Sequence, residues 1–176
     1  MSSKLILVLG GARAGKSTFA MRLAKELAGE HSVTFIATAQ ALDDDMAQRI
    51  SRHQQERPQT WSTIEEPYHL DRALITVPDS SVVLVDCLTL FVSNWLLRGE
   101  DRKLPEICQS LLTAVQSQNQ TVICVSNEVG LGIVPETPLG RTFRDLLGRI
   151  NQQFAAAADE VYLLVAGLPL RLKPRD

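Results

Sequence analysis

The residues best suited to chemistry lie near the start of the chain, in the segment Gly10-Gly11-Ala12-Arg13-Ala14-Gly15-Lys16-Ser17. This segment matches the full Gly-x-x-x-x-Gly-Lys-Ser/Thr pattern of a phosphate-binding loop, with a short apolar run before it and helical spacing after it. In such a loop, backbone N–H groups surround the phosphates. The lysine contacts the β- and γ-phosphates, and the serine hydroxyl is placed for Mg²⁺. We therefore expect Lys16 and Ser17 to bind a nucleoside triphosphate and its metal.

A carboxylate further along the chain supports the same interpretation. Asp86 follows the apolar run Val82–Val85, and a carboxylate at the end of such a strand can support the metal of a bound nucleotide. An aspartate at a strand end can also do no more than cap the next helix. Because the phosphate-binding loop is present, we favour the metal role and predict a Mg²⁺ site formed by Ser17 and Asp86.

A third polar cluster, Asn127-Glu128-Val129-Gly130, follows another apolar run. Its place invites comparison with the Asn-Lys-x-Asp element by which switch GTPases read guanine. Here a glutamate stands in place of the lysine and a glycine in place of the aspartate, and the complete element occurs nowhere else in the sequence. The pattern therefore disfavours a switch GTPase. It leaves two roles open for Glu128, a contact to substrate or metal and a helix cap.

One of the three histidines, His53, lies on a predicted helix that begins at the nucleotide-facing edge of the sheet. The acidic run Asp43–Asp45 is typical of a helix N-terminus, where negative charge is favourable. Met46, Ile50 and His53 then recur at helical spacing and share one face. A neutral imidazole is a good nucleophile near neutral pH. By residue type alone, a histidine that packs on a helix face is the simpler interpretation, so both roles stay open.

The apolar pattern describes the scaffold that must position these residues. Five short runs of branched apolar residues are continuous rather than alternating, as expected for parallel strands covered on both faces. Stretches with helical spacing separate them, which predicts right-handed crossovers and a doubly wound, mostly parallel α/β sheet with helices on both faces. Ligands of such sheets gather at the carboxyl ends of the strands. The predicted strands are Leu5–Leu9, Val33–Ala37, Val82–Val85, Val122–Val125 and Val161–Val165, with an edge strand at Leu168–Leu172, and the predicted helices are Thr18–Leu27, Asp43–Glu56, Tyr68–Ile75, Leu104–Gln118 and Leu139–Ala158.

Length and composition limit the class of protein. A chain of 176 residues with 45% apolar and 22% charged residues fits one domain, residues 1–176, with a sizeable core. The net charge of −2 provides no basic field for nucleic acid. No apolar run approaches the roughly 20 residues that span a bilayer. Cys87, Cys108 and Cys124 are widely spaced and odd in number, which favours free core thiols in a cytoplasmic protein.

Taken together, these and further segments resemble the bifunctional adenosylcobinamide kinase / adenosylcobinamide-phosphate guanylyltransferase family of cobalamin biosynthesis. The resemblance spans nearly the whole chain in the family's order, which makes it far more specific than a phosphate-binding loop alone. It implies a P-loop NTPase fold of the RecA-like type. The matching segments are Gly10–Ser17, Ile36-Ala37-Thr38, Leu42-Asp43-Asp44-x-Met46, Arg49-Ile50-x-x-His53, Arg57-Pro58, Asn127-Glu128-Val129-Gly130-x-Gly132-Ile133-Val134-Pro135, Phe143-Arg144-Asp145, Gly148-Arg149-x-Asn151-Gln152 and Ala158-Asp159-Glu160-Val161.

The resemblance implies two reactions. In the first, ATP or GTP phosphorylates the hydroxyl on the aminopropanol arm of adenosylcobinamide. In the second, the histidine that matches His53 attacks the α-phosphate of GTP, expels pyrophosphate and carries GMP as a phosphoramidate. Adenosylcobinamide phosphate then accepts the GMP and becomes adenosylcobinamide-GDP. Covalent catalysis of this kind predicts ping-pong behaviour for the second reaction.

The resemblance also implies which residues form the site. Lys16 and His53 are the expected catalytic residues, and Mg²⁺ is expected on Ser17 and Asp86. This chain has Arg52 before His53 where some members carry a second histidine, and Asp86 where some carry glutamate; neither change argues against activity. A homotrimer is expected from the family. Nucleotide contacts are expected at Gly10, Gly11, Ala12, Arg13, Ala14, Gly15, Lys16, Ser17, Ala37, Thr38, Ala39, Arg57, Pro58, Gln59, Thr60, Glu65 and Asp86.

Two other functions fit the phosphate-binding loop. A simple P-loop small-molecule kinase would use Lys16, Ser17 and Asp86, with His53 as a structural residue. A nucleotide-driven binding or assembly module, related to recombinase-type ATPases, would transfer no group to a small molecule. Protein-bound label from α-labelled GTP would distinguish the transferase from both.

Overall fold

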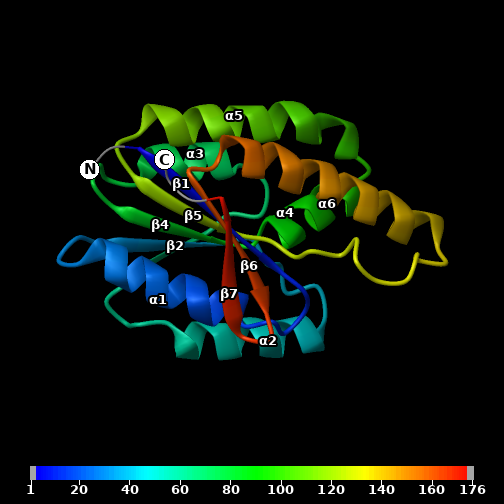
Figure 1. Ribbon diagram of the computed structural model, residues 1–176, viewed down its shortest axis with the longest axis horizontal. Coiled ribbons are helices and arrows are strands. Elements are labelled where there is room, and N and C mark those ends of the chain that lie inside the picture. The colour runs from blue at the N-terminus through cyan, green and yellow to red at the C-terminus, as the bar shows by residue number, and fades with distance from the viewer. Residues whose placement is uncertain (1–2, 174–176) are drawn as a thin grey trace.

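One twisted β-sheet runs through residues 3–173, the part of the chain that the computed structural model describes (Figure 1). The strand order is β3-β2-β4-β5-β1-β6-β7, and neighbouring strands are parallel except for β6 and β7, which pair antiparallel. The carboxyl ends of the parallel strands therefore meet at one edge of the sheet. In chain order the strands are β1 (Lys4–Gly10), β2 (Val33–Ala37), β3 (Ser62–Glu65), β4 (Val82–Asp86), β5 (Thr121–Val125), β6 (Glu160–Val165) and β7 (Leu168–Lys173).

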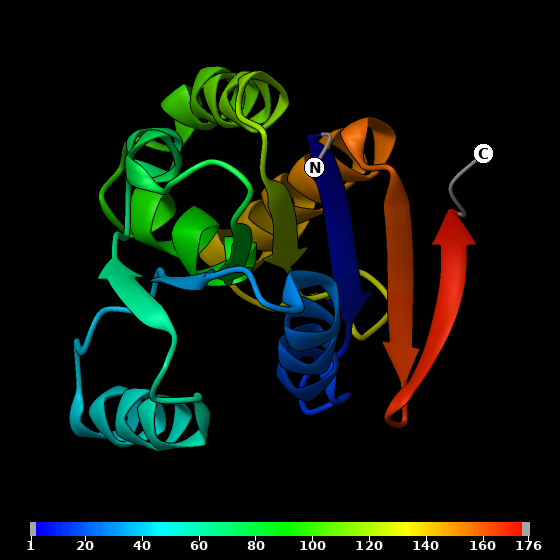
Figure 2. The same cartoon turned by 90° about the vertical axis from the view of Figure 1, so that its left-hand side faces the viewer.

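Helices cover both faces of this sheet. α1 (Lys16–Ala28) and α2 (Asp44–Glu56) lie on one side. α3 (Leu70–Thr76), α4 (Leu88–Leu97), α5 (Leu104–Ser117) and α6 (Pro138–Ala157) lie on the other (Figure 1). A short 3-10 helix, Asp101–Lys103, joins α4 to α5. Figure 2 shows α1 close beneath the sheet and α2 further out, below the end that carries β2 and β3.

The core forms because successive side chains of a strand point to opposite faces. In β1, Leu5 and Leu7 join the apolar cluster under α3–α6. Ile6 and Val8 join the cluster under α1. All four of these side chains are buried. A strand buried on both faces must be apolar at every position, which is the continuous pattern that the sequence carries.

The structure confirms the predicted fold class, and every predicted strand and helix is present with boundaries shifted by a few residues at most. Three elements were missed: β3, α4 and the short 3-10 helix Asp101–Lys103. β3 is an edge strand with largely exposed, polar residues, so it has no apolar run. α4 is apolar on most sides because Leu88, Phe91, Val92 and Trp95 are all buried, so it has no amphipathic period.

None of the helices between residues 3 and 173 combines the length and apolar character needed to cross a bilayer.

Candidate active site

The loop between β1 and α1 has the backbone conformation that its glycines permit. Gly10 has φ of 154° and Gly15 has φ of 90°, a region that residues with a Cβ rarely adopt. A Cβ at Gly10 would also lie 2.7 Å from the Leu164 carbonyl oxygen of β6. Lys16 Nζ donates a hydrogen bond to the Gly11 carbonyl oxygen at 2.7 Å, so its ammonium group folds over the loop. Burial lowers the pKa of Lys16 below its ordinary value.

A turn far away in the sequence braces this loop. The backbone N–H of Gly167, between β6 and β7, donates to the Ala14 carbonyl oxygen at 3.1 Å. A Cβ at Gly15 would lie 3.3 Å from the Gly167 Cα, so the two backbones approach closely. Strand β6 thus carries the chain to the phosphate-binding loop, and the turn before β7 packs against that loop. No local sequence signal marks this contact.

The two predicted metal ligands, at the start of α1 and at the end of β4, are in contact. Ser17 Oγ donates to Asp86 Oδ2 at 3.4 Å. Burial raises the pKa of Asp86, and the positive charges of His53, Arg57 and Lys16 together with the Ser17 hydrogen bond oppose that rise. A hydroxyl and a carboxylate are hard oxygen donors that fit Mg²⁺, which is bound by one or two protein groups together with substrate phosphates. No group of three or more His, Cys, Asp or Glu side chains suited to a metal occurs in the described residues.

Thr38 ties the ends of β2 and β4 together. Its Oγ1 donates to the Cys87 carbonyl oxygen and accepts from the Cys87 N–H, both at 2.8 Å. Its backbone N–H donates to the Asp86 carbonyl oxygen at 3.2 Å, and its own carbonyl oxygen accepts from Asn94 Nδ2 at 2.8 Å. The side chain is fully buried. Of the predicted nucleotide contacts at 37–39, Ala37 and Ala39 line the cleft described next, whereas the Thr38 hydroxyl is engaged within the protein.

A cleft of about 850 Å³ opens at the carboxyl edge of the sheet, between the phosphate-binding loop and α2. It brings together Lys16, Ser17 and Asp86 on one side and His53 on the other. His53 is 43% exposed, and its Nδ1 lies 3.7 Å from Glu56 Oε2 on the same helix. Asp43 begins that helix by accepting the Met46 N–H at 2.7 Å, as the acidic run predicts. The predicted site residues that line the cleft are Ala12, Arg13, Lys16, Ser17, Ala37, Ala39, His53, Arg57, Glu65 and Asp86.

Arg57 stands where the cleft meets a second hollow of about 410 Å³, which Pro58 and Gln59 also line. Its guanidinium carbon lies 3.6 Å from the centroid of the Phe35 ring. Its Nε is buried without a hydrogen-bond partner among the described residues. Burial lowers the pKa of Arg57, while the charges of Asp86 and Glu65 act in the opposite sense. Arg57 therefore presents a desolvated cation to the cleft, a group suited to phosphate.

The remaining predicted contacts are placed as follows. Glu65 lines both hollows, while its neighbour Glu66 accepts the backbone N–H groups of Tyr68 and His69 at 2.8 and 2.9 Å and so shapes the chain before α3. Thr60 is exposed and lies in the turn after Gln59. Gly10, Gly11, Ala14 and Gly15 shape the loop.

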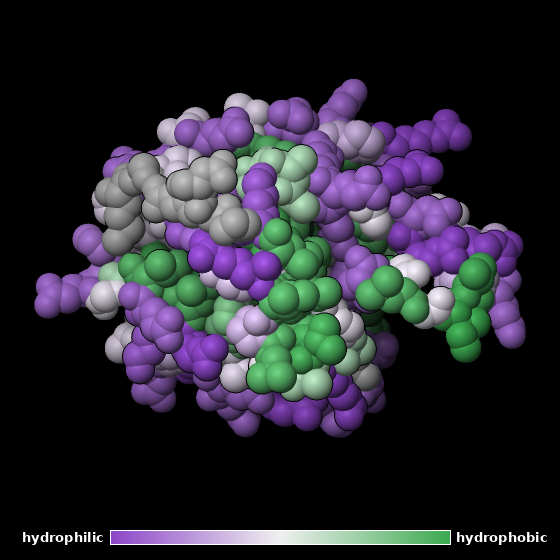
Figure 3. Space-filling model, in the orientation of Figure 1, coloured by the Kyte–Doolittle hydropathy of each residue, from purple (hydrophilic) through white to green (hydrophobic). Residues whose placement is uncertain are grey.

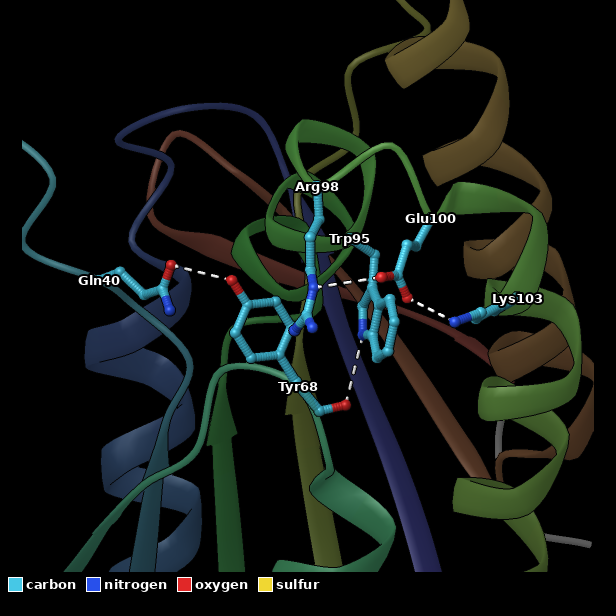
Figure 4. A network of polar contacts seen from close by, with 6 residues as sticks. All are labelled: Gln40, Tyr68, Trp95, Arg98, Glu100 and Lys103. Carbon is cyan, nitrogen blue, oxygen red and sulfur yellow. Dashed lines mark hydrogen bonds and ion pairs between the residues drawn. The ribbon is translucent and has the colours of Figure 1, made fainter.

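The sequence did not single out Gln40, which also lines the cleft. The Tyr68 hydroxyl donates to Gln40 Oε1 at 3.3 Å, so the amide nitrogen stays available to the cleft (Figure 4). Tyr68 is itself held edge-on to Trp95, with ring centroids 5.5 Å apart, and under the Arg98 guanidinium at 4.8 Å. Arg98 pairs with Glu100 at 3.4 Å. The network therefore runs from the end of α4 to the rim of the cleft.

Glu128 is half-buried and accepts the Gly130 N–H at 2.6 Å, while its own N–H donates to the Gly10 carbonyl oxygen at 3.0 Å. It closes a turn and caps no helix. Its neighbour Asn127, which was not predicted as a site residue, lines the cleft.

Comparison with known proteins shows the family of this chain. The family described as Cobinamide kinase / cobinamide phosphate guanyltransferase matches residues 6–172. This chain belongs to that family. The Bifunctional adenosylcobalamin biosynthesis protein CobU of Escherichia coli (strain K12) is 44% identical over 184 residues, covering 96% of this chain and 99% of the relative. CobP of Pseudomonas aeruginosa, of the same description, is 43% identical over 168 residues, covering 95% and 96%. The chain is accordingly a transferase of cobalamin biosynthesis.

Solved structures of more distant proteins share the fold of this cobinamide kinase family member. The flagellar accessory protein FlaH of Methanocaldococcus jannaschii matches with a TM-score of 0.55 at 16% identity, covering 99% of this chain and 80% of that one. A KaiC-like protein of Pyrococcus horikoshii matches with a TM-score of 0.50 at 16% identity, covering 92% and 71%. At such low identity the likeness supports the P-loop NTPase fold alone.

Proposed function

We propose that this chain performs both family reactions in the one cleft, with His53 as the covalent carrier of GMP. The observation that carries the proposal is that His53 and the phosphate-binding loop line the same cleft. Lys16 would neutralise the phosphates, and Mg²⁺ would be held by Ser17 and Asp86 and would counter charge on the phosphate oxygens. GTP serves the guanylyl step, and ATP or GTP serves the kinase step.

The guanylyl step uses one nitrogen of His53. Because Nδ1 faces the Glu56 carboxylate, Nε2 is the free nitrogen. Nε2 attacks the α-phosphorus, a nitrogen–phosphorus bond forms and the bond to pyrophosphate breaks. The proton on the imidazole passes to Glu56 or solvent. A phosphate oxygen of cobinamide phosphate then attacks the same phosphorus and restores the imidazole.

A second nucleophile in the cleft is a poor carrier. Cys87 also lines it, but burial raises the pKa of its thiol to about 12. At neutral pH such a cysteine holds almost no thiolate, which is the reactive form. His53 is therefore the residue to test.

The test uses GTP labelled at the α- or the γ-phosphate, with Mg²⁺ and without cobinamide. We expect a protein-bound, acid-labile and base-stable adduct from the α label alone, and none from His53→Asn. His69→Asn is the matched control, because that histidine is outside the cleft lining, and it should form the adduct normally. A wild-type protein that binds or hydrolyses GTP without forming an adduct would exclude the covalent mechanism and leave the simple kinase.

We also propose that the protein assembles as a homotrimer, with the cytoplasm as its compartment. Large apolar side chains are exposed on the loop before α6 and in its first turn, at the end of β6 and along β7, and Figure 3 shows apolar groups on a protruding segment and on the neighbouring face. The residues are Leu131, Ile133, Val134, Leu139, Val165, Leu168, Leu170 and Leu172. Sedimentation velocity at several concentrations tests the trimer, and a monomer throughout would contradict it.

A further inference from the structure

The cleft contains a polar side chain with no assigned role, Asn127, at the carboxyl end of β5. We propose that its amide donates a hydrogen bond to the γ-phosphate during the kinase reaction, and has no part in the guanylyl step. This inference rests on the proposed function, since it assigns the residue to one of the two reactions.

The strand order places Asn127 beside the γ-phosphate position. β5 lies between β1, which leads into the phosphate-binding loop, and β4, which ends at Asp86. Val125, two residues earlier, is level with Val8 and with Asp86 in the two neighbouring strands. A metal held by Ser17 and Asp86 would counter the charge on the phosphates of a bound nucleotide, so the transferring phosphoryl group is expected near these two residues. Asn127, two residues beyond the end of β5, thus lines the cleft between the elements that would hold the transferring phosphoryl group.

The backbone of Asn127 is fixed by buried side chains. Its N–H donates to Thr89 Oγ1 at 2.7 Å, and its carbonyl oxygen accepts from Asn151 Nδ2 at 2.9 Å. Asn151 Oδ1 in turn accepts from Ser126 Oγ at 2.7 Å. Thr89 is 7% exposed, Asn151 is 5% exposed and Ser126 is fully buried. These contacts satisfy both main-chain groups without using the side-chain amide.

The side-chain amide of Asn127 has no hydrogen-bond partner within residues 3–173. A half-buried amide that has no protein partner, on a backbone held in position, is suited to a ligand. Its NH₂ group can donate to a phosphate oxygen, and it adds no charge to the cleft. A donor fixed before the reaction stabilises charge that develops on the phosphoryl oxygens as the group transfers.

His53 approaches from the opposite side. α2 follows β2 and precedes β3, and these strands lie beyond β4 from β5. In the kinase step the cobinamide hydroxyl oxygen bonds to the γ-phosphorus, the bond from that phosphorus to the bridging oxygen breaks, and the hydroxyl proton leaves to solvent. Asn127 neither gains nor loses a proton. In the guanylyl step the γ-phosphate stays within the pyrophosphate that departs, so its contact changes little.

The test compares Asn127→Ala and Asn127→Asp with wild-type protein in both reactions. Cobinamide-dependent formation of nucleoside diphosphate measures the kinase step. Acid-labile protein label from α-labelled GTP, without cobinamide, measures the guanylyl step. We expect kcat of the kinase step to fall about 100-fold in Asn127→Ala, the typical cost of one lost donor. Asn127→Asp should be worse, because its carboxylate repels phosphate. The guanylylation rate at saturating GTP should be unchanged, with at most a higher KM for GTP.

Asn119→Ala is the matched control, because this exposed asparagine precedes β5 at the opposite edge of the sheet. It should retain both activities, and thermal melting of all three variants establishes that they are folded. Equal losses in the two reactions, or an unchanged kinase step in Asn127→Ala, would overturn the inference. Its failure is distinct from failure of the proposed function, in which the wild-type protein itself would lack one of the two reactions.

Discussion

The two sides of the cleft differ in how deeply the elements that carry their residues are buried. On the first, Lys16 and Ser17 begin α1 just after the loop that follows β1, and Asp86 ends β4. Nearly all residues of these two strands are buried. On the second, His53 stands on α2, where none of the described side chains is fully buried. Fixed dipoles and charges suit phosphate binding because they need no reorganisation during the reaction. A helix with few packing contacts can shift at small cost in free energy, which suits a group that must approach a phosphorus atom and then release it.

The largest effect should come from Lys16→Met, because that charge serves phosphates in both reactions. We expect both rates to fall by at least about 100-fold, while His53→Asn abolishes only the guanylyl step. Steady-state kinetics and adduct formation measure the two losses. Lys25→Met, at the exposed end of α1, is the control and should act like the wild-type protein. If Lys16→Met retained either reaction, the two reactions would not share one nucleotide site.

Asp86→Asn should lower both Mg²⁺-dependent rates by about 100-fold, yet stabilise the protein without metal. The pKa of Asp86 is raised above 3.8 by burial. The folded state therefore binds the proton more tightly than the unfolded state, and wild-type stability falls as pH rises from about 3.8 through the raised pKa. Asparagine avoids this loss at neutral pH.

Each pKa unit of that elevation corresponds to about 1.4 kcal/mol, or a Tm gain of roughly 3–6 °C for a chain of this size. Melting in EDTA across the pH range measures the gain, which should vanish below pH 3.8. Asp79→Asn, on an exposed turn, is the control and should show no gain in Tm. A Tm of Asp86→Asn below that of the wild type at pH 7 would show that the ionised carboxylate stabilises the fold.

Thr38→Val tests how much the hydrogen bonds between the ends of β2 and β4 stabilise the protein. The change keeps the shape of the side chain but leaves the buried Cys87 N–H without its acceptor. A buried group that loses its partner costs about 1–3 kcal/mol, so the urea midpoint should fall by a corresponding amount. Thr38→Ser keeps the hydroxyl and should lose less. Equal urea midpoints for Thr38→Val and Thr38→Ser would show that the hydrogen bonds of the Thr38 hydroxyl do not stabilise the fold.

The smallest effect is expected from Asp43→Ala at the start of α2. Loss of this N-cap costs the helix about 1 kcal/mol, so guanylylation should slow several-fold while the kinase rate and the global Tm stay nearly constant. Asp43→Asn can still accept the Met46 N–H and serves as the control. A large drop in Tm would mean that α2 is an integral part of the core rather than a peripheral support for His53.

Local patterns in the sequence predicted most of the scaffold, the phosphate-binding loop and Asp86, whereas the family resemblance added further cleft residues such as Arg57 and Glu65. The glycines at 10 and 15, the continuous strands, the acidic start of α2 and the carboxylate after β4 are signals that depend on a residue and its near neighbours. These features follow from backbone sterics, helix capping and burial, which act over a few residues. The phosphate-binding loop and its metal partner could therefore be predicted, and their family follows from the order of the motifs.

Only the tertiary structure decided which distant residues complete the cleft. The strand order puts Asn127 between the loop and Asp86, turns Glu65 rather than Glu66 toward the cleft, and brings Gly167 against the loop. It also turns the Thr38 hydroxyl inward to Cys87. These contacts join residues that are remote in the chain, so no local period or cap marks them; they exist because parallel strands bring their carboxyl ends to one edge.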